Sequence, residues 1–241
     1  MEHHFIDRYA ELDSPVHRWD VRVKTAFFFC AVVVFVSTPT DAYARFAAFA
    51  AVVFAALLAS RLPLLFFAKR LAIVMPFIAA VGFFHLFSGK PWGERLALFG
   101  GLCMKSMLAV SALILLISTT RFARLLEALE AFGVPQVFIK TFAFAYRYIF
   151  LLQDELMRMA RAARARNFAP KHLFQVHKFG WIIGSFFIRS YERAERVYLA
   201  MLARGFAGRF ARSEPAPIRW SDATAGIASI AALVLIRSLP L

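Results

Sequence analysis

Five long apolar runs divide this 241-residue chain and restrict its fold more than any other feature. A helix needs about 20 apolar residues to cross the hydrocarbon core of a bilayer. The runs cover residues 25–38, 44–60, 71–87, 96–118 and 220–239. The first run reaches this length only when its flanking residues are counted. We therefore predict an all-α integral membrane protein with about five transmembrane helices.

The segment 119–220 differs from the rest, because no run in it is both long and free of charge. It holds 17 of the chain's Lys and Arg residues and 7 of its Asp and Glu residues, which supplies +10 of the net charge of +14. We predict three parts. Residues 1–118 hold the N-terminal segment and four transmembrane helices, 119–220 form a large cytoplasmic insert of long helices, and 221–241 form the last transmembrane helix.

The distribution of Lys and Arg among the short loops predicts the orientation, because cytoplasmic loops are enriched in both. Residues 8–24 carry four and residues 61–70 carry three, whereas the loops on the opposite side carry Arg45 on one and two basic residues on the other. The N-terminus is therefore predicted to be cytoplasmic. A sixth span at 173–190 would leave a basic helix outside, so we predict that this stretch lies at the interface and continues into the helix after it.

Two basic helical stretches in the insert end in an Ala-Arg pair. The first ends in Ala165, Arg166 and Asn167, and the second in Ala203, Arg204 and Gly205. Gly205 is predicted to take the left-handed conformation that commonly ends a helix. The alternative is a surface helix whose basic last turn is favoured by the helix dipole.

The second stretch also predicts a buried apolar stripe and an ion pair. Its apolar residues recur at the spacing of one helix face. They are Tyr191, Ala194, Tyr198, Met201 and Leu202. Glu192 precedes Arg196 by four residues, which favours a pair on the helix surface.

Arginines are dense on the first stretch, at positions 158, 161, 164 and 166, with Asp154 and Glu155 just before them. We expect Asp154 and Glu155, four and three residues before Arg158, to offset this run on the helix surface. The run fits a solvated face, contact with anionic lipid, or docking to an acidic pocket of a soluble partner, for which the planar guanidinium is suited.

The sequence contains no HExxH, GxSxG, Walker or dinucleotide-binding motif, so we predict no enzymatic activity and no cofactor. His3 and His4 are a weak metal candidate at a solvated terminus, and no metal site is predicted. Lys105 is predicted to be structural. Cys30 and Cys103 lie in apolar runs without disulfide or zinc spacing. The pI near 10.6 is attributed to the membrane rather than to nucleic acid, because of the apolar runs.

Several of these stretches together resemble the T subunit of energy-coupling-factor (ECF) transporters. They are SPVHRWDVRVK at 14–24, FGVP at 132–135, YRYIFLLQDELMRMARAARARNF at 146–168 and RSYERAERVYLAMLARGF at 189–206. The opening FIDRYAELDSPVHRWDVRVK is similar to the CbiQ branch, which is dedicated to cobalt. Asn167 departs from the glycine of the family motif, and asparagine tolerates the left-handed conformation.

This resemblance implies the transmembrane coupling subunit of an ECF-type ABC importer for cobalt. Two ATPase subunits would each accept one helix end, with Arg166 and Arg204 binding acidic or carbonyl groups in their grooves. A separate membrane-embedded subunit would bind the cobalt, and the chain would be a multi-pass protein of the bacterial inner membrane. The alternatives are a T subunit for nickel or a vitamin, and a membrane-anchored scaffold without a transport role.

Overall fold

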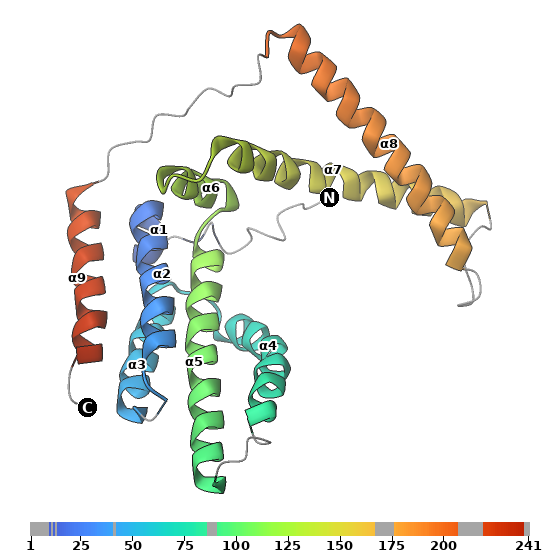
Figure 1. Cartoon of the computed structure of the whole chain (residues 1–241). Coiled ribbons are helices and arrows are strands. Elements are labelled where there is room, and N and C mark those ends of the chain that lie inside the picture. Colours follow the sequence, from blue (N-terminus) through green and yellow to red (C-terminus); the bar gives the residue numbers. More distant parts are fainter. Residues whose placement is uncertain are drawn as a thin grey trace. The chain divides into compact units, whose positions relative to one another are not determined.

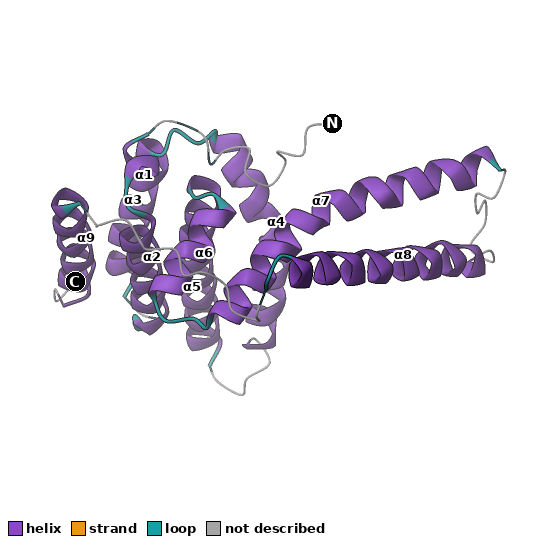
Figure 2. Ribbon diagram, turned by 90° about the horizontal axis from the view of Figure 1, so that it is seen from above, coloured by secondary structure: helices purple, strands orange, loops and turns teal. Residues whose placement is uncertain are grey.

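Helices are the regular elements throughout the part of the chain that the structure describes (Figures 1 and 2). The computed structural model describes residues 10, 12, 14–40, 42–85, 91–166, 176–206 and 219–238. The chain divides into two compact units. The first comprises Met1–Phe132 and Pro215–Leu241, and the second comprises Gly133–Glu214. The sequence also predicts an amphipathic turn on the membrane surface around Phe5, Ile6 and Tyr9, and these residues lie outside the described ones.

The first unit holds the apolar helices together with two shorter, polar or amphipathic ones. They are α1 (Pro15–Arg18), α2 (Val21–Ser37), α3 (Tyr43–Ala59), α4 (Leu64–His85), α5 (Trp92–Thr119), α6 (Phe122–Ala131) and α9 (Trp220–Ser238). The helix α2 contacts α5, α6 and α9, whereas α4 packs on α5 (Figure 1). Phe35 of α2 and Phe49 of α3 are almost completely buried, with ring centroids 5.0 Å apart. Apolar side chains of α2, α3, α5 and α9 form one shared core.

Each of the five predicted apolar runs corresponds to a helix, which confirms the all-α membrane fold. Three helices are long and apolar enough to span a bilayer, at Leu64–Phe83, Trp92–Thr119 and Trp220–Ser238. The helices α2 and α3 have 17 residues each, or about 26 Å at about 1.5 Å per residue. This length is slightly below the hydrocarbon thickness of about 30 Å. The total of five membrane spans therefore stays a prediction.

The basic loop predicted at 61–70 was wrong in its second half. The helix α4 begins before Lys69 and Arg70, so both residues lie within it. The Arg70 guanidinium lies 4.7 Å from the ring centroid of Phe66 and donates to Ser118 Oγ at 3.5 Å. A long side chain with such contacts keeps its charge solvated near a helix end while its stem covers apolar surface. The sequence also predicts a turn at 88–95, whereas α5 already begins at Trp92.

Contacts between distant residues join one set of helix ends in the first unit. Lys24, near the start of α2, donates from Nζ to the carbonyl oxygen of Thr119 at the end of α5, at 3.0 Å. The backbone N–H of Asp20 donates to Asp222 Oδ2 near the start of α9, at 3.2 Å. The starts of α2 and α9 and the end of α5 therefore lie on one side of the unit.

The opposite helix ends meet in the same way. Tyr43, the first residue of α3, donates from its hydroxyl to the carbonyl oxygen of Ala97 near the start of α5, at 3.5 Å. Gly101 of α5 lies so close to the turn after α2 that a Cβ there would be 2.8 Å from the carbonyl oxygen of Thr40. The helix α2 thus runs opposite to both α3 and α5, as expected for successive membrane spans with α4 between α3 and α5.

The second unit contains two long helices, α7 (Gln136–Ala165) and α8 (Val176–Ala203), which cross and contact each other (Figure 1). Gly133 takes a positive φ of 89° and Pro135 caps the start of α7, so the chain leaves α6 by a turn. The helix α8 is continuous from Val176 to Ala203. This confirms that the stretch predicted at 173–190 continues into the helix after it, although 173–175 lie outside the described residues.

Candidate functional site

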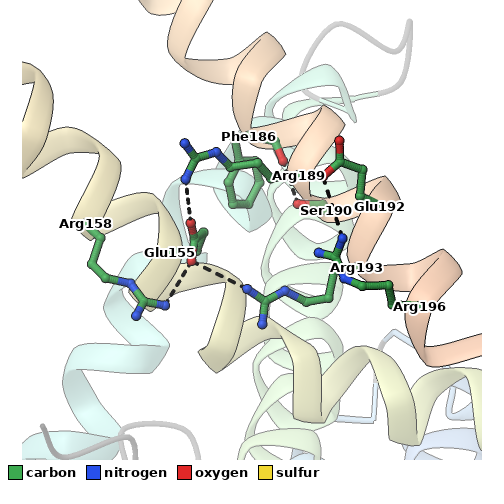
Figure 3. A network of polar contacts seen from close by, with 8 residues as sticks. All are labelled: Glu155, Arg158, Phe186, Arg189, Ser190, Glu192, Arg193 and Arg196. Carbon is green, nitrogen blue, oxygen red and sulfur yellow. Dashed lines mark hydrogen bonds and ion pairs between the residues drawn. The ribbon is translucent and has the colours of Figure 1, made fainter. Parts of the chain in front are cut away.

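The crossing of α7 and α8 is held by one carboxylate and three guanidinium groups, which we call the Glu155 cluster (Figure 3). Arg158 Nη2 donates to Glu155 Oε2 at 2.9 Å, one turn along α7. From α8, Arg189 Nη1 donates to Glu155 Oε1 at 3.2 Å, and Arg193 Nη2 lies 3.6 Å from Oε2. The Glu155 side chain is only 14% exposed, so these ion pairs are partly shielded from water.

The C-terminal ends of α7 and α8 are the same number of residues away from the Glu155 cluster. Arg166 follows Glu155 by eleven residues, and Arg204 follows Arg193 by eleven residues. At about 1.5 Å per residue, each end lies about 16 Å beyond the crossing along its helix axis. Two helices joined in this way change the separation of their ends when the crossing angle changes.

The second helix end has the predicted glycine cap. Gly205 takes φ 81°, its N–H donates to the carbonyl of Leu202 at 2.9 Å, and the N–H of Phe206 donates to that of Met201 at 3.0 Å. These two bonds define a Schellman cap, which satisfies carbonyl groups that the end of a helix leaves open. The prediction for Gly205 is therefore confirmed. Arg204 is exposed immediately before this cap.

The structure describes the C-terminal end of α7 only as far as Arg166. The backbone N–H of Arg166 donates to the carbonyl of Ala162 at 3.2 Å, and the residue is exposed. Asn167, the predicted substitute for the motif glycine, lies outside the described residues. Both motif arginines that are described are thus exposed at the ends of their helices.

A groove of about 690 Å³ lies between α7 and α8. Its polar lining comes from Glu155, Arg158, Arg166, Ser185 and Arg189. The excess of guanidinium over carboxylate gives this groove a positive charge, which favours a carboxylate-bearing partner. The arginine-rich face predicted from sequence therefore leads along α7 from the Glu155 cluster to Arg166.

The buried stripe predicted on α8 was wrong at every position except Met201, which is half-buried. Tyr191 is 67% exposed, Tyr198 55% and Leu202 43%. The half-buried residues recur on a neighbouring face, and they are Ile182, Phe186, Ser190, Arg193, Val197 and Met201. Arg193 on this second face reaches Glu155 of α7, so a partly polar face is the covered one. The predicted apolar stripe is open to a partner.

The local ion pairs were predicted from sequence, whereas the contacts between the helices were missed. Glu155 pairs with Arg158 as expected, and Arg196 Nη1 lies 3.8 Å from Glu192 Oε2. The links from Glu155 to Arg189 and Arg193 join residues more than 30 positions apart, and no local spacing indicates them. The opposite charges on the two predicted helices were the only available signal.

Within the described residues, no group of three His, Cys, Asp or Glu side chains lies close enough to hold a metal ion. Lys105 is half-buried within α5. His3 and His4 lie outside the described residues. The chemistry that this site offers is therefore recognition of anionic groups by exposed guanidinium ions.

Comparison with known proteins gives a family match and several relatives. The family model CbiQ, described as cobalt transport protein, matches residues 13–215. The energy-coupling factor transporter transmembrane protein EcfT of Brevibacillus brevis is 30% identical over 257 aligned residues, covering 96% of both chains. The cobalt transport protein CbiQ of Rhodobacter capsulatus is 28% identical over 156 residues, covering 63% of this chain and 64% of that protein.

A further relative shares a shorter segment. The nickel permease LarQ of Lactiplantibacillus plantarum is 35% identical over 131 residues, which are 54% of this chain. This chain spans only 46% of the length of LarQ, slightly less than half. The similarity to LarQ is therefore partial, whereas the similarity to EcfT covers nearly the whole of both proteins.

Proposed function

Because this chain belongs to the CbiQ family of cobalt transport proteins, we propose that it is the transmembrane coupling subunit of an ECF-type ABC importer. In this role it transmits ATP-driven movement from two ATPase subunits to a membrane-embedded subunit that binds the substrate. The observation that carries the proposal is the pair of crossed helices, α7 and α8, each ending in an exposed arginine. The chain itself is proposed to have no catalytic role.

The Glu155 cluster suits a joint between two moving helices. One carboxylate faces three guanidinium groups, two of them on α8, so rotation of α8 against α7 can exchange one ion pair for another. Charge-assisted hydrogen bonds of this kind are stronger than neutral ones and tolerate such exchange of partners. A change of crossing angle at this joint would move Arg166 relative to Arg204.

The surroundings of Arg204 fit a protein partner. Tyr198, Leu199 and Leu202 are 43–56% exposed on the last two turns of α8. Protein interfaces commonly combine exposed aromatic and aliphatic anchors with arginine. We therefore propose that each ATPase subunit covers one helix end and offers a carboxylate or carbonyl group to its arginine. The partner's apolar groove would cover the stripe that is open in this chain.

Cobalt is the proposed cargo, on the basis of the family description and of the relative from Rhodobacter capsulatus. The specific observation that favours nickel instead is the 35% identity to the nickel permease LarQ. Uptake of radioactive cobalt and nickel by cells that express the complete transporter distinguishes the two metals. The alternatives that remain are a vitamin importer and a membrane-anchored scaffold, which predict uptake of neither metal.

Purification of the chain with its candidate ATPase subunits tests the coupling role. We expect Arg166→Ala and Arg204→Ala each to weaken co-purification, and the double variant to abolish metal-dependent ATPase activity. Loss of one charge-assisted contact corresponds to about 1.5–3 kcal/mol, or about a 10-fold to 100-fold weaker association. Arg196→Ala is the matched control, because Arg196 is an exposed arginine of α8 that pairs with Glu192 rather than ending the helix.

Full assembly and metal uptake by the double variant would overturn the coupling role of the two arginines. Assembly without any ATP-dependent uptake of a metal or a vitamin by the wild type would support the scaffold. Equal losses in Arg196→Ala and in the motif variants would show a general effect of surface charge.

A further inference from the structure

A basic pocket lies in the first unit, where α1, the start of α2 and the junction of α5 with α6 meet. This name refers to the cavity of about 250 Å³ whose basic lining residues are His17, Arg18, Lys24, Arg121 and Arg124. The other described lining residues are apolar or threonine, and none of them is acidic. The pocket is separate from the crossing of α7 and α8, which belongs to the other unit.

Lys24 forms the buried part of the basic pocket. The whole residue is inaccessible to solvent, with a relative exposure of 0%. Its ammonium group donates to the carbonyl oxygen of Thr119 at 3.0 Å and contacts the hydroxyls of Thr119 and Thr120 at 3.5 and 3.4 Å. All of these are neutral oxygens within the described part of the chain. A buried ammonium is costly unless an opposite charge compensates it, and an anion in the pocket would supply that charge.

The other cations of the pocket come from separate elements and reach solvent. Arg18 ends α1, Arg121 precedes α6 and Arg124 lies in its first turn, and all three are exposed. His17 is fixed by the buried Ser14, whose Oγ lies 2.6 Å from His17 Nδ1. Arg18 of α1, Lys24 of α2 and Arg124 of α6 place cations from three elements around one cavity, and a bound anion would relieve their repulsion. The pocket is therefore open to an anion at its mouth and positively charged at its base.

The size and chemistry of the cavity fit a phosphate group. A volume of about 250 Å³ is the share of about eight water molecules, at about 30 Å³ each. Guanidinium groups bind phosphate through two parallel hydrogen bonds, and an ammonium adds a point charge. Such a cavity holds a phosphate group together with water.

The position of the pocket favours a lipid as the source of the phosphate. Thr119 is the last residue of α5, a helix long and apolar enough to span a bilayer. The end of a spanning helix lies at the depth of the lipid headgroups. Basic pockets between helices at this depth are suited to anionic headgroups. The pocket also lies on the side of the unit that the charge distribution predicts to be cytoplasmic, where anionic lipids attract basic residues.

We propose that the basic pocket binds the phosphate group of an anionic phospholipid and thereby ties α1, α2 and the α5–α6 junction together at the membrane surface. A bound headgroup compensates the charge of Lys24 from within the pocket. The proposal does not depend on the coupling role of α7 and α8.

Lipid binding by the full-length protein in detergent tests this site. Native mass spectrometry would count phosphatidylglycerol and phosphatidylcholine molecules retained by the wild type, Arg18→Gln, Arg124→Gln and the double variant. A basic residue near an anionic headgroup contributes about a fivefold factor in affinity. The double variant is therefore expected to bind phosphatidylglycerol about 25-fold more weakly than the wild type. Arg196→Gln removes the same charge from α8 and is expected to bind phosphatidylglycerol as the wild type does.

The outcomes separate the possible ligands and the possible sites. Preferential retention of phosphatidylglycerol that is lost in the double variant but not in Arg196→Gln supports the proposal. Equal retention of phosphatidylglycerol by all variants would show that the basic pocket is not the binding site. Displacement of phosphatidylglycerol by millimolar inorganic phosphate overturns the lipid assignment and gives the same pocket to a soluble phosphate. The arginine variants are preferred to Lys24→Met because their side chains are exposed, which leaves the fold intact.

Discussion

At the scale of single residues, two adjacent glycines of α5 have opposite surroundings. A Cβ on Gly101 would lie 2.8 Å from both the carbonyl oxygen and the Cβ of Thr40. A Cβ on Gly100 would meet nothing within 4 Å in the described part of the chain. The close approach of Thr40 explains why α5 requires a glycine at 101, and the same reason does not apply at 100.

Alanine substitutions at these two positions should therefore change stability in opposite directions. Gly100→Ala is expected to stabilise the protein by about 0.5–1 kcal/mol, because alanine restricts the unfolded chain and favours a helix. Gly101→Ala has the same helix preference but forces backbone atoms apart, at a cost of about 1–3 kcal/mol. Thermal unfolding of the purified protein in detergent measures both changes. Equal stability of the two variants would contradict the close approach of Thr40 to α5.

The sequence predicted the helix cap at Gly205 and the ion pairs within one helix, whereas it missed the contacts between distant residues. The left-handed Gly205 and the pairs at four-residue or three-residue spacing follow from the geometry of one helix. The bond of Lys24 to Thr119 joins residues 95 positions apart, and that of Asp20 to Asp222 joins residues 202 apart. In the sequence, Lys24 contributes only to the basic charge before the first apolar run, because no sequence signal shows that its ammonium is buried.

At the scale of helices, the Glu155 cluster carries the polar contacts between α7 and α8. Glu155→Gln keeps the shape of the side chain and removes the charge that three arginines share. Glu192→Gln is the matched control, because Glu192 pairs with Arg196 within α8 alone. We expect the angle between α7 and α8 to vary more in Glu155→Gln than in Glu192→Gln.

Distances between spin labels measure this angle. Labels on Ala162→Cys and Ala200→Cys, in a background with Cys30→Ala and Cys103→Ala, place one probe on each helix beyond the crossing. A broader distance distribution is expected for Glu155→Gln, together with a lower rate of coupled transport. The three ion pairs are partly exposed, so a loss of about 1 kcal/mol, or about fivefold in coupled rate, is the expected size. An unchanged distribution with an unchanged rate would show that apolar contacts alone hold the crossing.

Helix periodicity predicted which stretches are helices but not which of their faces are covered. The stripe from Tyr191 to Leu202 is a true helix face, and it is exposed because α7 meets the face with Arg193 instead. The predicted loop at 61–70 failed for a related reason. The sequence assigns Lys69 and Arg70 to the loop before the third apolar run, although long basic side chains continue a helix near the membrane surface.

At the scale of the whole molecule, the helix ends of the first unit sort into two sides. Arg18, Lys24, Arg70, Arg121 and Arg124 lie at the ends where α2 and α9 begin and α5 finishes. The opposite ends, where α3 and α5 begin, carry fewer basic residues. This arrangement agrees with the positive-inside distribution, which was calculated from loops alone. Length and composition therefore predicted the apolar helices well, because both are properties of a continuous segment.

Accessibility of single cysteines tests the predicted orientation. In the background without Cys30 and Cys103, Tyr43→Cys lies at the start of α3 and is predicted to be outside. Glu195→Cys lies on an exposed face of α8 and is predicted to be cytoplasmic. A maleimide that cannot cross membranes is expected to label Tyr43→Cys in intact cells and Glu195→Cys only after permeabilisation.

The alternative with a sixth span at 173–190 gives a different labelling pattern. That span would move Arg204 and Glu195→Cys outside, so both cysteines would react in intact cells, and an ATPase in the cytoplasm would reach only Arg166. The continuous α8 is not among the helices found apolar enough to cross a bilayer within the described residues. Its charged second half, from Arg189 to Arg204, would be left on the side where the positive-inside rule disfavours it. We therefore expect Glu195→Cys to stay protected in intact cells, and its labelling there would contradict the coupling function together with the orientation.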